Sequence, residues 1–187
     1  VGDESYSGST SFERFHSVIQ KLTGFRFIYP VHQGRAAERI LLSSLIQEGD
    51  AVMSNTLFDT TRGNVEFVGG KGVDIPVHQA SQPDTLFPFK GNMDLSKLKA
   101  GLDDLDNRVR LVIMTVTNNA VGGQPVSMEN IARSSALCRE RGVPFFLDAA
   151  RFAENCWFIH TKEKGYRNVP LYNIAQEMFR HADGCVF

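Results

Sequence analysis

The stretch "VRLVIMTVTNNAVGGQPVSMENIARSSALCRERGVPFFLDAA", residues 109–150, decides the fold of this chain. It begins with an almost continuous apolar run, which is typical of a strand buried on both faces of a parallel sheet. After a polar loop, Ser127 is placed to cap a helix and Gly142 to end it. A second apolar run, residues 143–150, completes a strand–helix–strand order. This order predicts a right-handed βαβ unit with two parallel strands.

The rest of the chain repeats this alternation of helical and extended patterns. Helices are expected at residues 11–24, 33–50, 94–105 and 171–181, strands at residues 25–31, 50–55 and 182–187, and two strands joined by a hairpin turn at residues 64–77. Asp94 is the expected N-cap of one helix, and Gly24 is the expected end of another. The sequence therefore predicts one α/β domain, with a mostly parallel sheet and helices on both faces.

The composition is that of an ordinary globular protein and argues against several functional classes. Of the 187 residues, 42% are hydrophobic and 22% are charged, and the formal net charge is -1. No basic field predicts nucleic-acid binding, no apolar run is long enough to span a membrane, and the N-terminus lacks a signal-peptide pattern. The three cysteines, Cys138, Cys156 and Cys185, are odd in number and lack CxxC spacing. They favour reduced thiols in a cytoplasmic protein.

Three polar loops are expected at one edge of the sheet. They are "VHQGR" at residues 31–35, "TNNAVGGQP" at residues 117–125 and "DAAR" at residues 148–151, and each follows a predicted strand. In open sheets of this kind, ligands bind beyond the carboxyl ends of the strands. We therefore expect the binding site at this edge.

The first of these loops has the features of an anion site. Gly34 stands at a helix start, where free backbone N–H groups attract anions and a glycine allows close approach. Gln33 precedes it, and Arg35 can add a bidentate contact. The alternative is an ordinary helix start with a solvated arginine, and this stretch alone does not choose between them.

Each of the remaining polar or aromatic candidates also has two interpretations. Asp148 and Arg151 form either a structural ion pair or a site in which the acid faces a protonated heteroaromatic nitrogen. Phe58 belongs to the core or a lid, or it stacks on a flat cofactor ring. Asn119 is a turn residue or a donor to a phenolate or carboxylate oxygen. Taken together, the functional alternatives describe a pocket for pyridoxal 5'-phosphate (PLP).

Seven motifs of this chain resemble those of the aromatic amino-acid β-eliminating lyases, the tryptophanases and tyrosine phenol-lyases. In chain order they are "GDESYSGS", "HQGRAAE", "FDTTRG", "FKGNMDL", "NNAVGGQPVS", "DAARFAEN" and "ADGC". The resemblance covers nearly the whole chain. It implies part of the large domain of a fold-type I PLP-dependent enzyme, and a cytoplasmic homotetramer that acts on an aromatic amino acid.

The resemblance also implies how the cofactor is held. Gln33, Gly34 and Arg35 would bind its phosphate, and Phe58 would stack on its ring. The other contacts, to the ring nitrogen and the phenolic oxygen, fall on the second and third loops. Asp148 would pair with the pyridine nitrogen, Arg151 would bond the phenolic oxygen, and Asn119 would contact that oxygen or the substrate carboxylate region.

Three further residues receive roles by resemblance alone. Tyr6 is similar to the family's catalytic tyrosine, which enters the active site of a neighbouring subunit. Glu4 is similar to a ligand of a monovalent cation, usually potassium, at the subunit interface. Asp59 follows the stacking phenylalanine, where tryptophanases have aspartate and tyrosine phenol-lyases have threonine, so the resemblance favours L-tryptophan as substrate and places Asp59 near the leaving group.

One element of the family is missing from residues 1–187. The lysine that forms the Schiff base lies in a Ser–x–Lys–Lys segment expected just after the last residue, and the small C-terminal domain would follow it. We therefore expect the chain to be a central piece of a longer protein, inactive by itself. Three alternatives stay open, namely a tyrosine phenol-lyase, another fold-type I enzyme such as a β-hydroxy amino acid aldolase, and a non-catalytic binding or assembly module.

Overall fold

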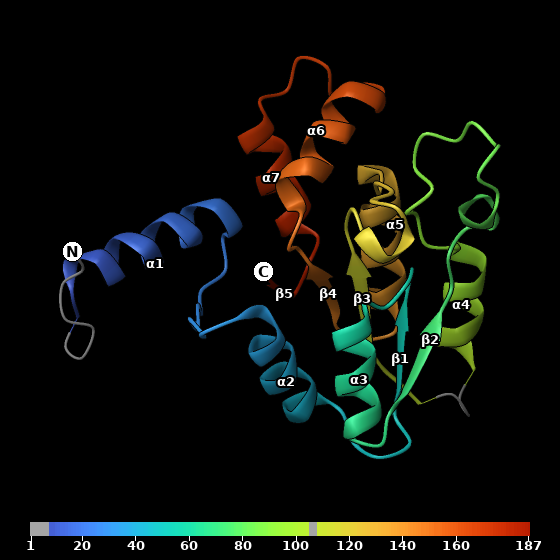
Figure 1. Cartoon of the computed structure of the whole chain (residues 1–187), viewed down its shortest axis with the longest axis horizontal. Coiled ribbons are helices and arrows are strands. Elements are labelled where there is room, and N and C mark those ends of the chain that lie inside the picture. Colours follow the sequence, from blue (N-terminus) through green and yellow to red (C-terminus); the bar gives the residue numbers. More distant parts are fainter. Residues whose placement is uncertain (1–7, 105–107) are drawn as a thin grey trace.

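The computed structural model describes residues 8–104 and 108–187, and its centre is a parallel sheet (Figure 1). Within these residues the strand order is β2-β1-β3-β4-β5, and every neighbouring pair is parallel. The predicted βαβ unit is confirmed as β3–α5–β4. The strands are β1 (Ala51–Ser54), β2 (Lys71–Asp74), β3 (Val109–Thr115), β4 (Phe145–Asp148) and β5 (Gly184–Val186).

Helices cover both faces of the sheet, as predicted. Leu111 and Ile113 of β3 pack with the residues of α2 and α3, whereas Val112 and Met114 pack with α4, α5, α6 and α7. This alternation follows from the two-residue period of a strand. The helices are α1 (Thr10–Thr23), α2 (Gly34–Leu45), α3 (Asp59–Phe67), α4 (Leu95–Asp103), α5 (Met128–Glu140), α6 (Phe152–Lys162) and α7 (Leu171–Arg180), with short 3-10 turns η1 (His78–Ser81) and η3 (Asn119–Val121).

The predicted helix ends are confirmed by their hydrogen bonds and backbone angles. The side chain of Asp94 accepts from two backbone N–H groups of α4, at 3.0 and 3.1 Å. Ser127 accepts from a backbone N–H group of α5 at 3.1 Å. Gly24 and Gly142 have φ angles of 75° and 65°, in the left-handed region that favours glycine.

The strand predicted at residues 25–31 is wrong. These residues run as an irregular segment that joins no strand in the described part of the chain. Phe27 and Tyr29 are 65% and 81% exposed, so the alternation of apolar residues buries no face. An apolar pattern becomes a strand only where a neighbouring strand supplies hydrogen bonds, and the edges of this sheet are β2 and β5.

The hairpin predicted at residues 64–77 is also wrong. Its first half belongs to α3, in which Thr61 and Val65 lie one turn apart and are both buried. Gly69 follows this helix with a φ angle of 79°, and β2 then runs parallel to β1. The stretch "NVEFV" has the composition of a strand, but its burial follows the helical period.

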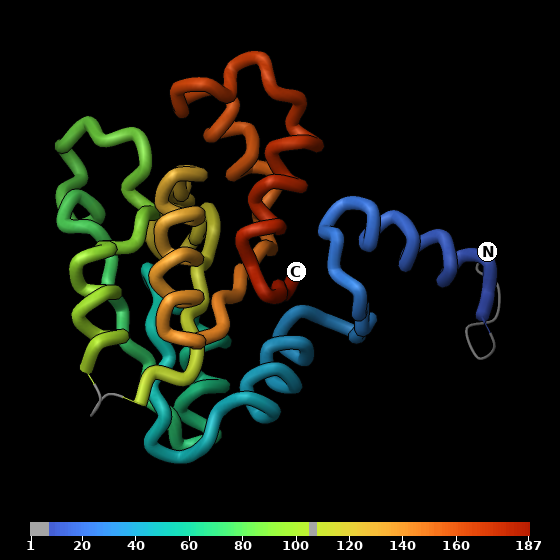
Figure 2. Tube along the Cα trace, turned by 180° about the vertical axis from the view of Figure 1, so that it is seen from behind, coloured from blue at the N-terminus to red at the C-terminus, as the bar shows by residue number. Residues whose placement is uncertain are grey.

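Helix α1 projects from the body as an arm (Figures 1 and 2). Its end contacts α7, where the side chain of Gln176 donates to the carbonyl oxygen of Lys21 at 2.8 Å. The apolar side chains of Phe12, Phe15 and Val18 on this helix are 40%, 45% and 57% exposed. Over the described ranges, none of the helices combines the length and apolarity needed to cross a bilayer.

Candidate active site

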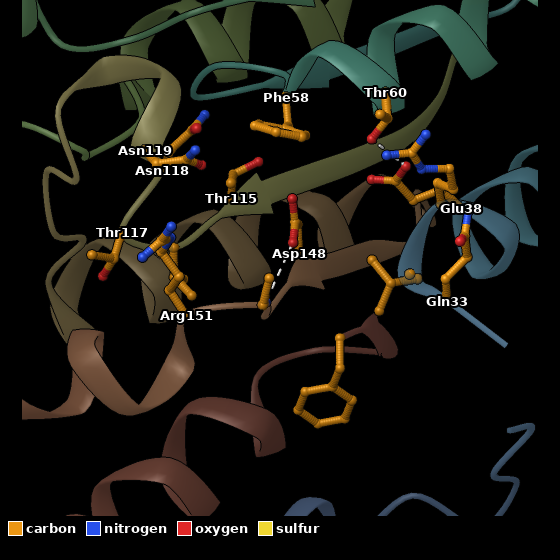
Figure 3. A pocket seen from close by; sticks show the side chains of 16 residues that line it. Gln33, Glu38, Phe58, Thr60, Thr115, Thr117, Asn118, Asn119, Asp148 and Arg151 are labelled. Atoms are coloured by element: carbon orange, nitrogen blue, oxygen red, sulfur yellow. Dashed lines mark hydrogen bonds between the residues drawn. The ribbon is translucent and has the colours of Figure 1, made fainter. Parts of the chain in front are cut away.

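A cavity of about 410 Å³ opens at the carboxyl ends of β3, β4 and β5 (Figure 3). The N-terminal ends of α2 and α3 form its other walls. This is the edge at which the sequence placed the site, and the volume suits a small cofactor. Of the predicted residues, the cavity wall includes Gln33, Gly34, Arg35, Phe58, Asn119, Asp148 and Arg151.

The start of α2 presents unpaired N–H groups to the cavity. Gln33 is extended, with φ −166° and ψ 158°, and its side chain makes no capping hydrogen bond. The N–H groups of Gly34 and Arg35 have no acceptor in the part of the chain that the structure describes. The first turn holds no acidic residue. These donors and the positive end of the helix favour an anion at this point.

Gly34 has a structural reason to be glycine as well. A Cβ atom added there would lie 2.9 Å from the backbone carbonyl oxygen of Phe187, just after β5. Such a contact is shorter than real Cβ atoms tolerate, and a backbone atom cannot swing aside as a flexible side chain can. The close approach of these two segments closes one side of the cavity.

Asp148 is a buried acid without a cationic partner. Asp148 is only 7% exposed, and its Oδ1 atom accepts a long hydrogen bond, 3.4 Å, from the N–H of Ala150. Burial, and then the negative charge of Glu38, raises the pKa of Asp148 to about 6. No described residue forms an ion pair with Asp148, so the structural ion pair with Arg151 is not observed.

Thr115 lies beside Asp148 in the register of β3 and β4. Its hydroxyl oxygen is buried and makes no hydrogen bond of ordinary geometry within residues 8–104 and 108–187, although it is close enough to the carboxyl group of Asp148 to favour its ionised form weakly. A buried hydroxyl without a partner is unfavourable, so such atoms indicate a site where a ligand supplies the missing bond. Together with Asp148, it gives the floor of the cavity unused hydrogen-bonding capacity.

Phe58 lies opposite these polar groups. Phe58 occupies the N-cap position of α3. Figure 3 shows the carboxyl group of Asp148 directed toward the wall that carries the ring of Phe58. Arg151 begins α6 and faces the same cavity near Asn118 and Asn119. The second and third loops therefore bring together an acid, a guanidinium group and amides, as the sequence predicted.

The loop after β3 is held from behind by a buried asparagine of α6. Asn155 is 0% exposed; its Oδ1 atom accepts from the hydroxyl of Thr117 at 3.0 Å and from the N–H of Val126 at 2.9 Å. Its Nδ2 atom donates to the carbonyl of Val126 at 2.9 Å. Thr117 has a φ angle of 51°, which is unusual for a β-branched residue. Asn155 therefore fixes a strained turn that lines the cavity.

Two further asparagines hold loops in the same way. Asn55 donates to the carbonyls of Gly91 and Thr115, both at 2.8 Å, and accepts from the N–H of Thr115 at 2.9 Å. Asn130 accepts from the N–H of Met93 at 2.8 Å and donates to its carbonyl at 2.9 Å. We refer to Asn55, Asn130 and Asn155 as the amide network. The role of these three asparagines in holding loops was not predicted from the sequence.

One described site residue, Asp59, is not brought into the cavity. Asp59 is the first residue of α3, where it is exposed and absent from the cavity wall. Tyr6 and Glu4 lie outside the described residues. Within those residues no group of three or more His, Cys, Asp or Glu side chains is arranged to hold a metal ion. The roles of these three residues stay predictions.

Glu38 is the most informative wall residue that sequence reasoning missed. It stands one turn after Gly34 on α2 and is only 6% exposed. Its Oε2 atom accepts from the hydroxyl of Thr60 at 2.7 Å, and its Oε1 atom accepts from Thr61 at 2.6 Å. The four-residue spacing from Gly34 is the signal that could have found it, because residues i and i+4 share a helix face.

The donor set fits the cofactor expected from the sequence. The start of α2 and Arg35 suit a phosphate, Phe58 suits a flat ring, and Asp148 suits a protonated ring nitrogen. The unpartnered hydroxyl of Thr115 adds a hydrogen bond that only a bound group or solvent can complete. A flat heteroaromatic molecule with a phosphate at one end matches this order of groups, and PLP is such a molecule.

Comparison with known proteins supports this assignment. The family model for beta-eliminating lyases matches residues 1–187. The chain is 48% identical to a tryptophanase of Hyphomonas neptunium over 98% of its length, and 50% identical to a tryptophanase of Rhodobacter capsulatus. It is 41% identical to a tyrosine phenol-lyase of Lacrimispora saccharolytica. The chain spans about 40% of the length of each of these relatives.

Solved structures support the fold at low sequence identity. A PLP-bound C-S lyase from Staphylococcus hominis matches with a TM-score of 0.58 at 18% identity, over 79% of this chain and 37% of that one. A candidate aromatic amino acid beta-eliminating lyase/threonine aldolase from Exiguobacterium matches with a TM-score of 0.60 at 18% identity, over 98% of this chain and 45% of that one. The fold is therefore that of the large domain of fold-type I PLP-dependent enzymes.

Proposed function

Because the chain belongs to the beta-eliminating lyase family, we propose that the full-length protein catalyses β-elimination from an aromatic amino acid with PLP as cofactor. The favoured reaction converts L-tryptophan to indole, pyruvate and ammonia. Residues 1–187 are the central part of the large PLP-binding domain in this proposal. The Schiff-base lysine and the small C-terminal domain belong to the segment expected after them.

The observation that carries the proposal is the buried carboxyl group of Asp148 in a cavity with no cation paired to it. Bound PLP supplies an electron sink for the negative charge that develops at the α-carbon of the substrate. Asp148, when ionised, holds a proton on the ring nitrogen and so keeps that sink effective. Above a pH of about 6 the acid is mostly ionised, as this role requires.

The other cavity residues bind and orient the cofactor. The N–H groups of Gly34 and Arg35, with the Arg35 and Gln33 side chains, hold the phosphate. Phe58 covers the ring. Arg151 lies at the opposite end of the cavity from α2, where it donates to the ring's phenolic oxygen together with Asn119.

The leaving group needs a proton at carbon, and three residues predicted by resemblance alone enter the proposal here. Tyr6 donates that proton into the active site of a neighbouring subunit. Asp59 lies near the leaving group, and Glu4 is a ligand of a potassium ion at the subunit interface. These assignments rest on the resemblance of the motifs that contain them.

Homotetramer formation belongs to the same proposal. The segment formed by α1 and residues 25–31 projects from the body (Figures 1 and 2), and it carries large apolar side chains that are exposed. Exposed apolar surface of this extent is typical of a protein–protein contact. A cytoplasmic location is also proposed, since Cys138, Cys156 and Cys185 are all free and burial raises the pKa of each thiol to about 12.

An Asp148→Ala variant of the full-length protein tests the reaction. Pyruvate release from L-tryptophan should fall by roughly a hundredfold or more, because the ring nitrogen loses its acid partner. Asp84→Asn, in an exposed loop, is the control and should retain activity. Activity of Asp148→Ala close to that of the unaltered protein would contradict the proposal.

A second candidate is tyrosine phenol-lyase activity, which the 41% identical relative favours. Assays with L-tryptophan and L-tyrosine, measuring indole and phenol, distinguish the two. A larger kcat/KM for L-tryptophan is expected from Asp59, and Asp59→Thr should lower that preference. Aldehyde release from a β-hydroxy amino acid without indole or phenol would favour an aldolase. Absence of PLP binding by the full-length protein would favour a non-catalytic module.

A further inference from the structure

Glu38 is a buried carboxylate in the wall of a cavity that is proposed to bind a phosphate. It lies in α2, 6% exposed, and lines the cavity together with Asp148. It forms no ion pair with any residue that the structure describes. A buried charge is costly unless hydrogen bonds satisfy it. Two threonine hydroxyls, from Thr60 and Thr61, do so here at 2.7 and 2.6 Å.

These two hydrogen bonds connect the two helix starts that form the cavity. Glu38 follows Gly34 by one helical turn, and Thr60 and Thr61 stand in the first turn of α3, just after Phe58. Figure 3 shows Glu38 and Thr60 meeting at one side of the cavity, with Phe58 beyond them. The anion-binding start of α2 and the ring of Phe58 are therefore tied to each other through one carboxylate.

Glu38 and Asp148 are also neighbours outside the main cavity. Both residues line a second, small and mostly apolar cavity, with a volume near 10 Å³, between α2 and the sheet. The ionisable groups of the main cavity wall are Arg35 and Glu38 from α2, Asp148 from β4 and Arg151 at the start of α6. The walls from β3, β5 and α3 contribute none. The charge of Glu38 adds to burial in raising the pKa of Asp148.

We propose that Glu38 is a positioning residue, which acts through Thr60 and Thr61 to fix the ring of Phe58 relative to the Gly34 turn. Its carboxylate stands in the same cavity wall as Asp148, and its charge adds to burial in favouring the neutral form of that acid. This inference rests on the proposed function, because it concerns how the same cavity receives PLP. In this role Glu38 does not touch the reacting atoms. Its effect is to hold the two binding ends of the cavity at the spacing of one cofactor.

Two substitutions separate geometry from charge in the full-length protein. Glu38→Gln keeps the shape of the side chain and removes its charge. Thr60→Val/Thr61→Val keeps the shape of both threonines and removes the hydroxyl donors, whereas Thr60→Ser/Thr61→Ser keeps the donors as a matched control. PLP dissociation constants are measured by absorption titration between pH 5 and pH 8, with thermal unfolding of each cofactor-free protein as a second readout.

Distinct results are expected for the two changes. The double valine variant should bind PLP roughly tenfold more weakly than the unaltered protein, and the double serine variant should match it. Glu38→Gln should shift the pH midpoint of PLP binding downward, because Asp148 ionises more readily without a neighbouring negative charge. The titration of the PLP phosphate is common to all variants and cancels in the comparison. If Glu38 had a purely structural role, Glu38→Gln would lower the unfolding temperature and leave the pH midpoint of PLP binding unchanged.

The outcomes that overturn the inference are distinct from those that overturn the proposed function. A full-length protein that binds no PLP ends the proposed function. If PLP binds but Glu38→Gln leaves the pH midpoint of PLP binding unchanged, Glu38 is not a positioning residue. The same conclusion follows if the double valine variant binds PLP as tightly as the double serine variant. If the double valine variant does not fold, Thr60→Val alone against Thr60→Ser repeats the test, because Thr60 is the less buried of the two threonines.

Discussion

The cavity floor and the amide network treat buried polar groups in opposite ways. In Asn55, Asn130 and Asn155 both the oxygen and the nitrogen of each amide have hydrogen-bond partners, mostly backbone groups of loops. Asp148 and Thr115, on the floor, are as deeply buried and keep hydrogen-bonding capacity unused. In the first region, hydrogen bonds within the chain offset the cost of taking the amides out of water. In the second, that cost is only partly offset in the described residues, and the proposed cofactor would supply the remaining hydrogen bonds.

The largest expected effect is in the amide network. Asn155→Ala leaves the hydroxyl of Thr117 and the N–H and carbonyl groups of Val126 without this partner, so the free energy of unfolding should fall by about 4 kcal/mol. Chemical denaturation of the full-length protein measures it. Asn173→Ala, at an exposed site on α7, should change stability by less than about 0.5 kcal/mol. Equal effects at both sites would remove the distinction between the two regions.

The cavity floor should respond with the opposite sign. In the folded protein the pKa of Asp148 is raised from 3.8 to about 6, so the folded state binds the proton more tightly and the unfolding free energy falls as pH rises through this window. Asp148→Asn should therefore stabilise the cofactor-free protein at pH 8 by up to roughly 3 kcal/mol, and by little at pH 4. Thermal unfolding at the two pH values measures the difference.

A paired acid provides the control for this test. Asp50 is also buried, but it pairs with Arg108 at 3.1 Å and accepts from the N–H of Gln47 at 2.9 Å. Asp50→Asn should destabilise the protein where Asp148→Asn stabilises it. A stabilising Asp50→Asn would show that burial alone, and not the lack of a partner, decides the sign.

Gly34 gives the next effect. Gly34→Ala sets a Cβ atom against the carbonyl of Phe187, so it should cost about 1–3 kcal/mol and weaken PLP binding as the segments shift. Gly63→Ala, inside α3 with open space around it, should stabilise by about 0.5–1 kcal/mol. Denaturation midpoints of the two variants should therefore move in opposite directions, and parallel shifts would contradict the close approach.

The smallest expected effect is at Thr115. Thr115→Val removes a hydroxyl that makes no hydrogen bond of ordinary geometry in the described residues, so at pH 4, where Asp148 is mostly neutral, the cofactor-free protein should gain about 1 kcal/mol. Thr23→Val is the contrast, since the hydroxyl of Thr23 donates to Ile19 at 2.8 Å and accepts from Phe25 at 3.2 Å, and its loss should destabilise. Unfolding temperatures measured without cofactor would contradict the comparison if Thr115→Val were the less stable of the two.

The sequence predicted the fold where local signals and tertiary packing agree. Asp94, Ser127, Gly24 and Gly142 end helices where expected, since caps depend on neighbouring residues alone. Residues 25–31 carry a strand-like pattern without a strand beside them, and the end of α3 carries strand-forming residues on a helix that covers the sheet. In both places the deciding contact is distant in sequence, and local pattern does not report it.

The site was predictable to the same extent. Gln33, Gly34, Phe58, Asp148 and Arg151 follow from motifs at predicted loop positions, and all line the cavity. The hydrogen bonds of Glu38 and the unused hydroxyl of Thr115 did not follow. They depend on the spacing between two helix starts and on the register of two strands, which only the folded chain defines.

The contact between Gly34 and Phe187 has a consequence for how the protein is made. The cavity walls come from segments spread along the sequence, and the last of them is the end of β5. A nascent chain emerging from the ribosome therefore lacks one side of the pocket until this strand has been synthesised and has joined β4. Under the proposed function, this side of the cavity becomes available to the cofactor only after β5 has joined the sheet.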